Sequence, residues 1–285
     1  MLIRIITSIV ALCVLIPVLI FSNTWILPIA ITFACIVANY EILKCIGTVK
    51  KYAVSGVLLF VSLIAPMLTR LLFLKLATGA IEFYMLTMAV ICMVVVLYLM
   101  AVLVFSRKKI SVSDVAISFF SSFYVTVGFS SIILLHDCSY GGPYTYLLIF
   151  IGAWITDIFA YFCGRLFGKH KLIPEISPKK TVEGSIGGTL FTGVAFVIFG
   201  LVGNHFGFND VQSYIKLFVF GIIAALVAQI GDLCMSALKR HYDVKDFGKI
   251  FPGHGGMLDR FDSIIAVSTV LLVMNIIVSS YKVIL

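Results

Sequence analysis

A polar stretch of the chain, residues 236–262, carries side chains suited to binding a polyphosphate together with its metal ions. It reads SALKRHYDVKDFGKIFPGHGGMLDRFD, in a sequence that is otherwise mostly apolar. Its cations, carboxylates and glycine-rich run are Lys239, Arg240, Lys245, Lys249 and Arg260; Asp243, Asp246, Asp259 and Asp262; and residues 253–256. Packing gives no reason for so many opposite charges in one loop, whereas a metal-bound polyphosphate does.

Two carboxylates of this stretch have the spacing of a magnesium site. Asp259 and Asp262 lie three residues apart at the start of the last apolar segment, on either side of Arg260. Mg²⁺ usually takes one or two carboxylates together with substrate phosphates. Asp232, near the end of the preceding apolar segment, is expected to bring a third carboxylate. Metal ions that clamp attacking and leaving oxygens are a common solution for phosphoryl chemistry.

Cations and a histidine in the same stretch are candidates to act on phosphate oxygens. Positive side chains neutralise the charge that develops on these oxygens in the transition state, and the candidates are Lys239, Arg240 and Lys245. His254, which lies between glycines, could bind phosphate or relay a proton, but an ordinary turn residue fits its position nearly as well. No GxSxG, HExxH or Walker-type sequence is present.

Two acids lie inside apolar segments and lead directly into basic loops. Asp157, Tyr161 and Arg165 are spaced by four residues, so a helix places them on one face, and Asp232 shares a face with Ser236 in the same way. A charge at the bilayer centre costs about 2.5–3.5 kcal/mol, so both acids should face protein or water. An ion pair between helices would explain them structurally. We favour a ligand or metal site because of the basic loops that follow.

The loop GKHKLIPEISPKKTVEGSIGG, residues 168–188, offers further candidate phosphate contacts. Pro174 and Pro178 prevent a continuous helix. Lys179 and Lys180 supply ammonium groups, and Glu183 precedes glycines that would let a phosphate approach the start of the next helix. Membrane topology and attraction to anionic lipid headgroups are the competing explanation for the two lysines.

The composition predicts an all-α, polytopic membrane protein. The chain has 285 residues, of which 61% are hydrophobic and 12% are charged, whereas a soluble domain averages about 25% charged residues. About 20 apolar residues cross a bilayer as a helix. The predicted spans are 4–21, 25–46, 52–70, 80–105, 115–135, 144–163, 186–206, 214–237 and 262–281. The first has no small-residue cleavage site, so we expect it to be a permanent span.

The distribution of positive charge predicts the orientation. With nine spans and a cytoplasmic N-terminus, all but four of the 21 lysines and arginines fall on the cytoplasmic side, as the positive-inside rule requires. The exceptions are Arg70, Lys75, Lys216 and Lys282. The net charge of +8 is therefore partly a topology signal, and no nucleic-acid partner is needed to explain it. The seven scattered cysteines, without a CxxC pair, are predicted to be small buried hydrophobes.

Most of the reactive residues lie in the second half of the chain. We therefore divide it into N-terminal spans, residues 1–143, and a catalytic region, residues 144–285. The catalytic region contains two long loops, 164–185 and 238–261, which the predicted topology places on the same cytoplasmic face.

The charged stretch also resembles a known family. Its pattern S-x-L-K-R-x4-K-D-x-G-x2-F-P-x-H-G-G-M-x-D-R-F-D resembles the full signature of the phosphatidate cytidylyltransferases, the CDP-diacylglycerol synthases. Two upstream pieces, D-x-x-A-Y-x-x-G-R from Asp157 and S-P-K-K-T-x-E-G from Ser177, also resemble this family. The N-terminal part agrees only in hydropathy and in Glu41, near the end of the second span.

The resemblance implies transfer of CMP from CTP to phosphatidic acid, with release of pyrophosphate. It implies a homodimer of many-spanning subunits among the lipids of a bacterial cytoplasmic membrane, and a Mg²⁺-dependent site, with room for a second cation such as K⁺. Asp232 and Asp259 would be the metal-associated carboxylates, with Asp262 beside them. The other expected site residues are Ser236, Lys239, Arg240, Lys245, Asp246, His254, Gly255, Gly256 and Arg260, joined by Asp157, Tyr161, Arg165, Lys179, Lys180 and Glu183.

Other functions stay open at this stage. A CTP-dependent transferase for another lipid phosphate and a polyprenol kinase would use similar groups. A transporter for an anionic solute would also combine membrane acids with basic loops, but transporter sites tend to lie near the midplane between repeated halves. The polar residues here are instead predicted on one face, and the halves are dissimilar. A non-catalytic lipid-binding scaffold would not need paired acids.

Overall fold

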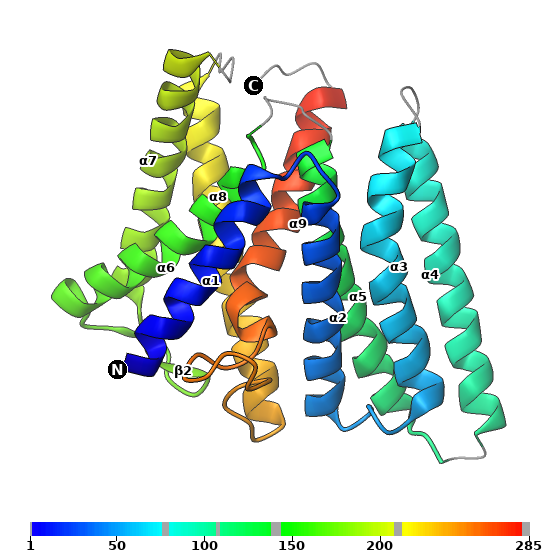
Figure 1. Ribbon diagram of the computed structural model, residues 1–285. Coiled ribbons are helices and arrows are strands. Elements are labelled where there is room, and N and C mark those ends of the chain that lie inside the picture. Colours follow the sequence, from blue (N-terminus) through cyan, green and yellow to red (C-terminus); the bar gives the residue numbers. More distant parts are fainter. Residues whose placement is uncertain (1, 76–79, 107–108, 138–143, 208–212, 281–285) are drawn as a thin grey trace. The chain divides into compact units, whose positions relative to one another are not determined.

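The computed structural model describes residues 2–75, 80–106, 109–137, 144–207 and 213–280. Within these ranges the chain forms helices and one short antiparallel hairpin, which confirms the predicted all-α fold (Figure 1). The helices are α1 Leu2–Ile20, α2 Ile26–Ile46, α3 Tyr52–Lys75, α4 Ala80–Phe105, α5 Val112–Asp137, α6 Leu147–Phe167, α7 Val182–Phe206, α8 Tyr214–His241 and α9 Leu258–Ser280. The hairpin strands are β1 Lys171–Ile173 and β2 Ser177–Thr181.

Each of the nine predicted spans coincides with a helix. Among the described residues, the eight helices α2 to α9 are long and apolar enough to cross a membrane. The first helix, α1, contributes a shorter apolar stretch, Ile9–Ile20. The protein is therefore an integral membrane protein.

The backbone forms two compact units, and each is discontinuous in sequence. The first unit contains residues 1–133 and 244–260, and the second contains residues 134–243 and 261–285. The segment 244–260 thus groups with the N-terminal helices, and the boundary at Arg260 falls in the first turn of α9. The division at residues 143 and 144 stays a prediction.

In the first unit, α2 supplies much of the core. It packs against α1 and α3, and α3 packs against α4. Asn39 of α2 is fully buried and donates to the carbonyl oxygen of Cys35 (3.0 Å) and to Oγ1 of Thr126 on α5 (3.2 Å). Such partners are needed because lipid offers polar groups no hydrogen bonds. In contrast, α4 leaves most of its apolar side chains exposed, as a lipid-facing helix does.

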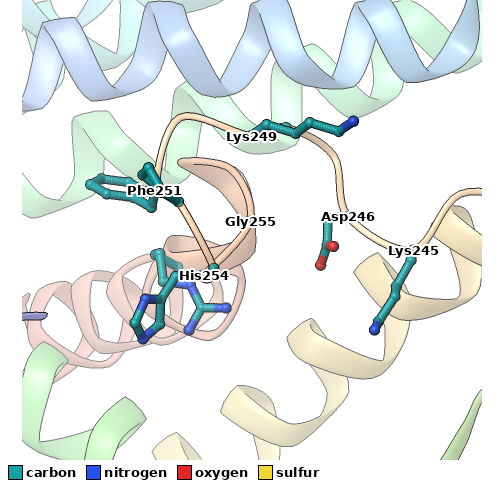
Figure 2. A pocket seen from close by; sticks show the side chains of 10 residues that line it. Lys245, Asp246, Lys249, Phe251, His254 and Gly255 are labelled. Atoms are coloured by element: carbon teal, nitrogen blue, oxygen red, sulfur yellow. The ribbon is translucent and has the colours of Figure 1, made fainter. Parts of the chain in front are cut away.

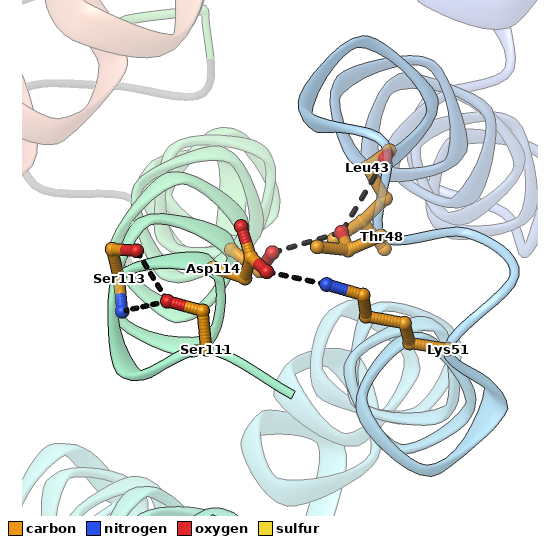
Figure 3. A network of polar contacts seen from close by, with 7 residues as sticks. Leu43, Thr48, Lys51, Ser111, Ser113 and Asp114 are labelled. Atoms are coloured by element: carbon orange, nitrogen blue, oxygen red, sulfur yellow. Dashed lines mark hydrogen bonds and ion pairs between the residues drawn. The ribbon is translucent and has the colours of Figure 1, made fainter. Parts of the chain in front are cut away.

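A polar network fixes the turn after α2 against the start of α5 (Figure 3). Gly47, at φ +82°, ends α2 in a left-handed conformation that favours glycine. Thr48 donates to the carbonyl oxygen of Leu43, and its hydroxyl lies 2.9 Å from that of Ser118. Lys51 forms an ion pair with Asp114 in the first turn of α5. These contacts stabilise the fold and involve none of the predicted site residues.

In the second unit, α6, α7 and α8 pack closely because glycines line their contacts. A Cβ added to Gly188 of α7 would lie 2.7 Å from the carbonyl oxygen of Thr156 on α6, and one added to Gly221 of α8 would lie 2.9 Å from that of Thr192. The hydroxyls of Thr156 and Thr192 are 2.8 Å apart. The glycines at the start of α7, which we expected to admit a phosphate, therefore bring helices together.

Candidate active site

The proline-containing loop forms the β1–β2 hairpin, and the predicted site residue Glu183 follows it in the first turn of α7. Helix α6 ends at Phe167, before the loop, as the two prolines predict. Thr181, the last residue of β2, caps α7 by accepting from the backbone N–H of Gly184 (3.1 Å). Glu183 accepts from the backbone N–H of His170, and its Oε1 lies 2.7 Å from Nδ1 of the same ring. Glu183, predicted to contact substrate, thus anchors the start of the hairpin in this structure.

The two adjacent lysines of β2 differ in their partners. Lys180 is largely buried and forms an ion pair with Asp232 of α8. Lys179 is exposed, as expected for the neighbouring position of a strand, where side chains alternate between faces. The structure therefore joins the two upstream predictions, the lysine loop and the membrane acid, through one direct contact.

Three carboxylates from three helices share one electrostatic environment in the second unit. Asp262 of α9 is almost completely buried and interacts electrostatically with Asp232 of α8, Lys239 of α8 and Asp157 of α6. Lys239 is buried as well, at 8% exposure. Together with Lys180 these residues form what we call the acid–lysine group.

The donor set of the acid–lysine group fits Mg²⁺ in chemistry, but the site is not preassembled. No three His, Cys, Asp or Glu side chains of the described chain are grouped closely enough to hold a metal. Asp232 and Asp262 offer the hard oxygens that Mg²⁺ prefers, and Oδ1 of Asp262 accepts from the backbone N–H of Ser263 (2.8 Å). A divalent ion bound at Asp232 would have to replace the ammonium group of Lys180.

The remaining predicted residues of the second unit are exposed or half-buried. Arg165 donates to the Tyr161 hydroxyl (3.3 Å), so the predicted spacing by four does place them on one helical face. Arg240 is exposed and donates to the carbonyl oxygen of Ile176 between the hairpin strands (3.4 Å). Ser236 lies one turn after Asp232 on α8 and is half-buried.

In the first unit, the segment 244–260, which we call the signature loop, is organised around buried carboxylates. Oδ2 of Asp259 accepts from the backbone N–H groups of Phe247 (2.8 Å) and Gly256 (2.9 Å). Asp259 is 8% exposed. This oxygen closes the loop on itself. The metal role predicted for Asp259 stays a prediction.

A second carboxylate reaches the signature loop from α2. Glu41 is 3% exposed; its Oε1 accepts from the backbone N–H of Met257 (3.0 Å) and its Oε2 from that of Leu258 (2.9 Å). A Cβ on Gly248 or Gly256 would collide with this carboxylate. Part of the glycine-rich sequence therefore encloses a carboxylate of the protein itself.

The outer side of the signature loop surrounds a cleft of about 640 Å³, a size typical of ligand sites. Lys245 and Asp246 border one side of it, and Phe251 and His254 border the other (Figure 2). The full lining is Lys245, Asp246, Gly248, Lys249, Phe251, Pro252, Gly253, His254, Gly255 and Arg260. Five predicted site residues thus meet here. Three cations against one carboxylate make the cleft suitable for an anion such as a polyphosphate.

The sequence alone did not predict two contacts of the signature loop. Nδ1 of His254 lies 2.7 Å from the hydroxyl of Thr7 on α1, and Glu41 holds the start of α9. A threonine in an apolar helix gives no signal of its own. Glu41 did give one, because it is the only carboxylate in the predicted span 25–46, and buried membrane acids usually have a partner.

Comparisons with known proteins identify the family of this chain. The cytidylyltransferase family matches residues 2–278. A phosphatidate cytidylyltransferase of Staphylococcus haemolyticus is 36% identical over 92% of this chain and 94% of its own length. Proteins of the same name from Staphylococcus aureus and Staphylococcus saprophyticus are 36% identical over 92% and 42% identical over 58% of this chain, covering 94% and 60% of their own lengths.

The match includes the N-terminal helices as well as the signature loop, although the signature resemblance seen in the sequence alone was confined to the second half. With the family match spanning residues 2–278, this chain belongs to the cytidylyltransferase family.

Proposed function

We propose that this protein is a phosphatidate cytidylyltransferase, which makes CDP-diacylglycerol and pyrophosphate from CTP and phosphatidic acid. Relatives of this name align with almost the entire chain. Among the structural observations, the acid–lysine group carries the proposal, because it combines oxygen ligands for a metal with cations for phosphate inside a membrane protein. A plain structural ion pair would need only one acid and one base.

The reaction follows from the charges of its substrates. A phosphate oxygen of phosphatidate attacks the α-phosphorus of CTP; the bond from that phosphorus to the bridging β-phosphate oxygen breaks, and pyrophosphate leaves with the electron pair. Phosphatidate is already an anion, so a strong general base is not required. Catalysis is then mainly positioning and neutralisation of charge.

The residues divide these tasks. In the second unit, Lys180 and Lys239 supply cations that lower the repulsion between anionic substrates. In the first unit, Lys245, Lys249 and Arg260 offer cations for phosphate oxygens to the cleft of the signature loop. Magnesium held by Asp232 and Asp262 would supply further neutralisation of the triphosphate. A K⁺ ion beside it and a homodimeric assembly belong to the proposal through the family resemblance alone.

The membrane supplies the second substrate. Phosphatidic acid keeps its acyl chains in hydrocarbon while its headgroup reacts at the water boundary. We propose that the active face is cytoplasmic, because this orientation leaves only four of the 21 lysines and arginines on the other side.

Purified protein in detergent micelles tests the proposal directly. Radiolabelled CTP and phosphatidate should give a labelled CDP-lipid and pyrophosphate, with turnover lost in EDTA and restored by Mg²⁺. Diacylglycerol, polyprenol and polyprenyl phosphate replace phosphatidate as control acceptors. A labelled CDP-lipid with polyprenyl phosphate alone would identify another lipid transferase, transfer of the γ-labelled phosphate of CTP to polyprenol would identify a kinase, and no product with any acceptor would reject the enzyme.

A further inference from the structure

The contact between Glu41 and the signature loop joins parts of the chain that are 216 residues apart. Glu41 belongs to α2, an N-terminal helix that contributes no residue to the cleft lining. Each of its oxygens accepts from a different backbone N–H, those of Met257 and Leu258. These are the groups at the beginning of α9, which have no partner within their own helix.

The Glu41 carboxylate also restricts which residue types can occupy the backbone positions beside it. Gly248 and Gly256 come from opposite ends of the loop, and a Cβ at either position would overlap the Glu41 carboxylate. Gly248 also lines the cleft. The shape of the cleft therefore depends on how closely the loop wraps around this one side chain.

The charge of Glu41 suits this role better than a neutral side chain would. Two N–H donors converge on it, and only a carboxylate accepts at both terminal atoms; the amide of a glutamine accepts at one and donates at the other. A carboxylate at the start of a helix is also favoured by the positive end of the helix dipole. Its two hydrogen bonds and its burial at 3% exposure hold it in one orientation.

We propose that Glu41 is a positioning residue for catalysis: it holds the signature loop and the start of α9 in the conformation that binds the triphosphate. This gives the N-terminal helices a role in the reaction. The inference rests on the proposed function for its kinetic readout and on the loop geometry for its structural readout.

The first test compares Glu41→Gln and Glu41→Ala with a matched change on the same helix, Asn39→Ala. Asn39 is also buried on α2, but its amide group bonds to Cys35 and Thr126 instead of the signature loop. Displacement of substrate-binding groups by about 1 Å can cost 10²-fold, so Glu41→Ala should lower kcat/KM for CTP by about that factor and Glu41→Gln by about 10-fold. Asn39→Ala should lower the melting temperature but leave KM for CTP within about twofold.

The second test uses the predicted overlap at Gly248. Gly248→Ala alone should lower kcat/KM for CTP, because its Cβ meets the carboxylate. In the Glu41→Ala background that clash is absent, so the double variant should be no less active than Glu41→Ala. Additive losses would show that the two positions act independently and would overturn the proposal. Equal effects of Glu41→Ala and Asn39→Ala on KM for CTP would also overturn the proposal.

Hydrogen–deuterium exchange at single-residue resolution separates this inference from the proposed function. In Glu41→Gln, the amides of Met257 and Leu258 should exchange faster, while that of Phe247, which bonds to Asp259, changes less. Unchanged exchange at 257 and 258 would reject the role of Glu41 even in an active enzyme. If the wild-type protein makes no CDP-lipid, the proposed function fails, and the exchange result still decides whether Glu41 holds the loop.

Discussion

The acid–lysine group and the signature loop both bury carboxylates, but they use them differently. In the signature loop, Asp259 and Glu41 accept from backbone N–H groups and fix the path of the chain. In the acid–lysine group, Asp232 instead pairs with the ammonium group of Lys180, a contact between two side chains that does not hold the backbone. The acids of this chain therefore divide into those that hold backbone N–H groups and those that pair with side-chain cations.

The largest effect should come from Asp232→Asn, because this change removes a charge from the reactive group while keeping the size of the side chain. Loss of a preorganised electrostatic contact costs about 10²–10³-fold in kcat, and we expect at least that reduction. Turnover of labelled CTP measures it, and an unchanged elution profile and melting temperature show that the fold is intact. Near-normal turnover would remove Asp232 from the metal role.

Lys180→Met should separate competition from catalysis in the same group. Without the ammonium group of Lys180, Mg²⁺ has no competitor at Asp232. The Mg²⁺ concentration that gives half-maximal activity should therefore be lower. The maximal rate should nevertheless fall by about 10–10²-fold, because a cation that neutralises phosphate is lost. The exposed neighbour gives the control Lys179→Met, expected to change both quantities less. A higher Mg²⁺ requirement in Lys180→Met would contradict the competition.

Asp259→Asn should behave as a structural change, in contrast to Asp232→Asn. Both N–H groups donate to one carboxylate oxygen, and a neutral amide oxygen accepts them more weakly. A hydrogen bond to a charged group contributes about 1.5–3 kcal/mol, compared with about 0.5–1.5 kcal/mol for a neutral one. We expect a lower melting temperature and faster proteolysis of the signature loop. Retained stability with complete loss of Mg²⁺-dependent turnover would instead move Asp259 to the metal site and abolish the distinction drawn above.

A smaller effect is expected for Thr7→Val, which keeps the shape of the side chain and removes the hydroxyl beside His254. One hydrogen bond contributes about 0.5–1.5 kcal/mol, so kcat/KM should fall by about 3–10-fold through poorer orientation of the imidazole. His254→Ala tests whether Thr7 acts through His254, because Thr7→Val should then lower kcat/KM little further in the His254→Ala background. Additive losses of kcat/KM in the double variant would show that Thr7 does not act through His254.

The smallest effect belongs to the network of Figure 3, where Lys51 and Asp114 are each about one-third exposed. A partly exposed ion pair contributes about 0–1 kcal/mol, so Asp114→Asn should hardly change the melting temperature and should leave turnover unaltered. A clear loss of activity would mean that this end of α2 and α5 takes part in the reaction.

The sequence predicted several structural features around the candidate site because the clues to them were local. The prolines predicted the break before α7, the spacing by four placed Tyr161 with Arg165, and the charge cluster predicted a polar cleft. It could not predict that Glu183 binds His170 or that Gly256 donates to Asp259, since each depends on a turn whose path is set by packing.

The sequence by itself determined the membrane-spanning helices and the family, because hydrophobic length and a dense motif are properties of short segments. Only the tertiary structure decided which groups each acid contacts. It paired Asp232 with Lys180 and brought Glu41 to Met257 and Leu258, and such contacts depend on helix packing that brings distant residues together.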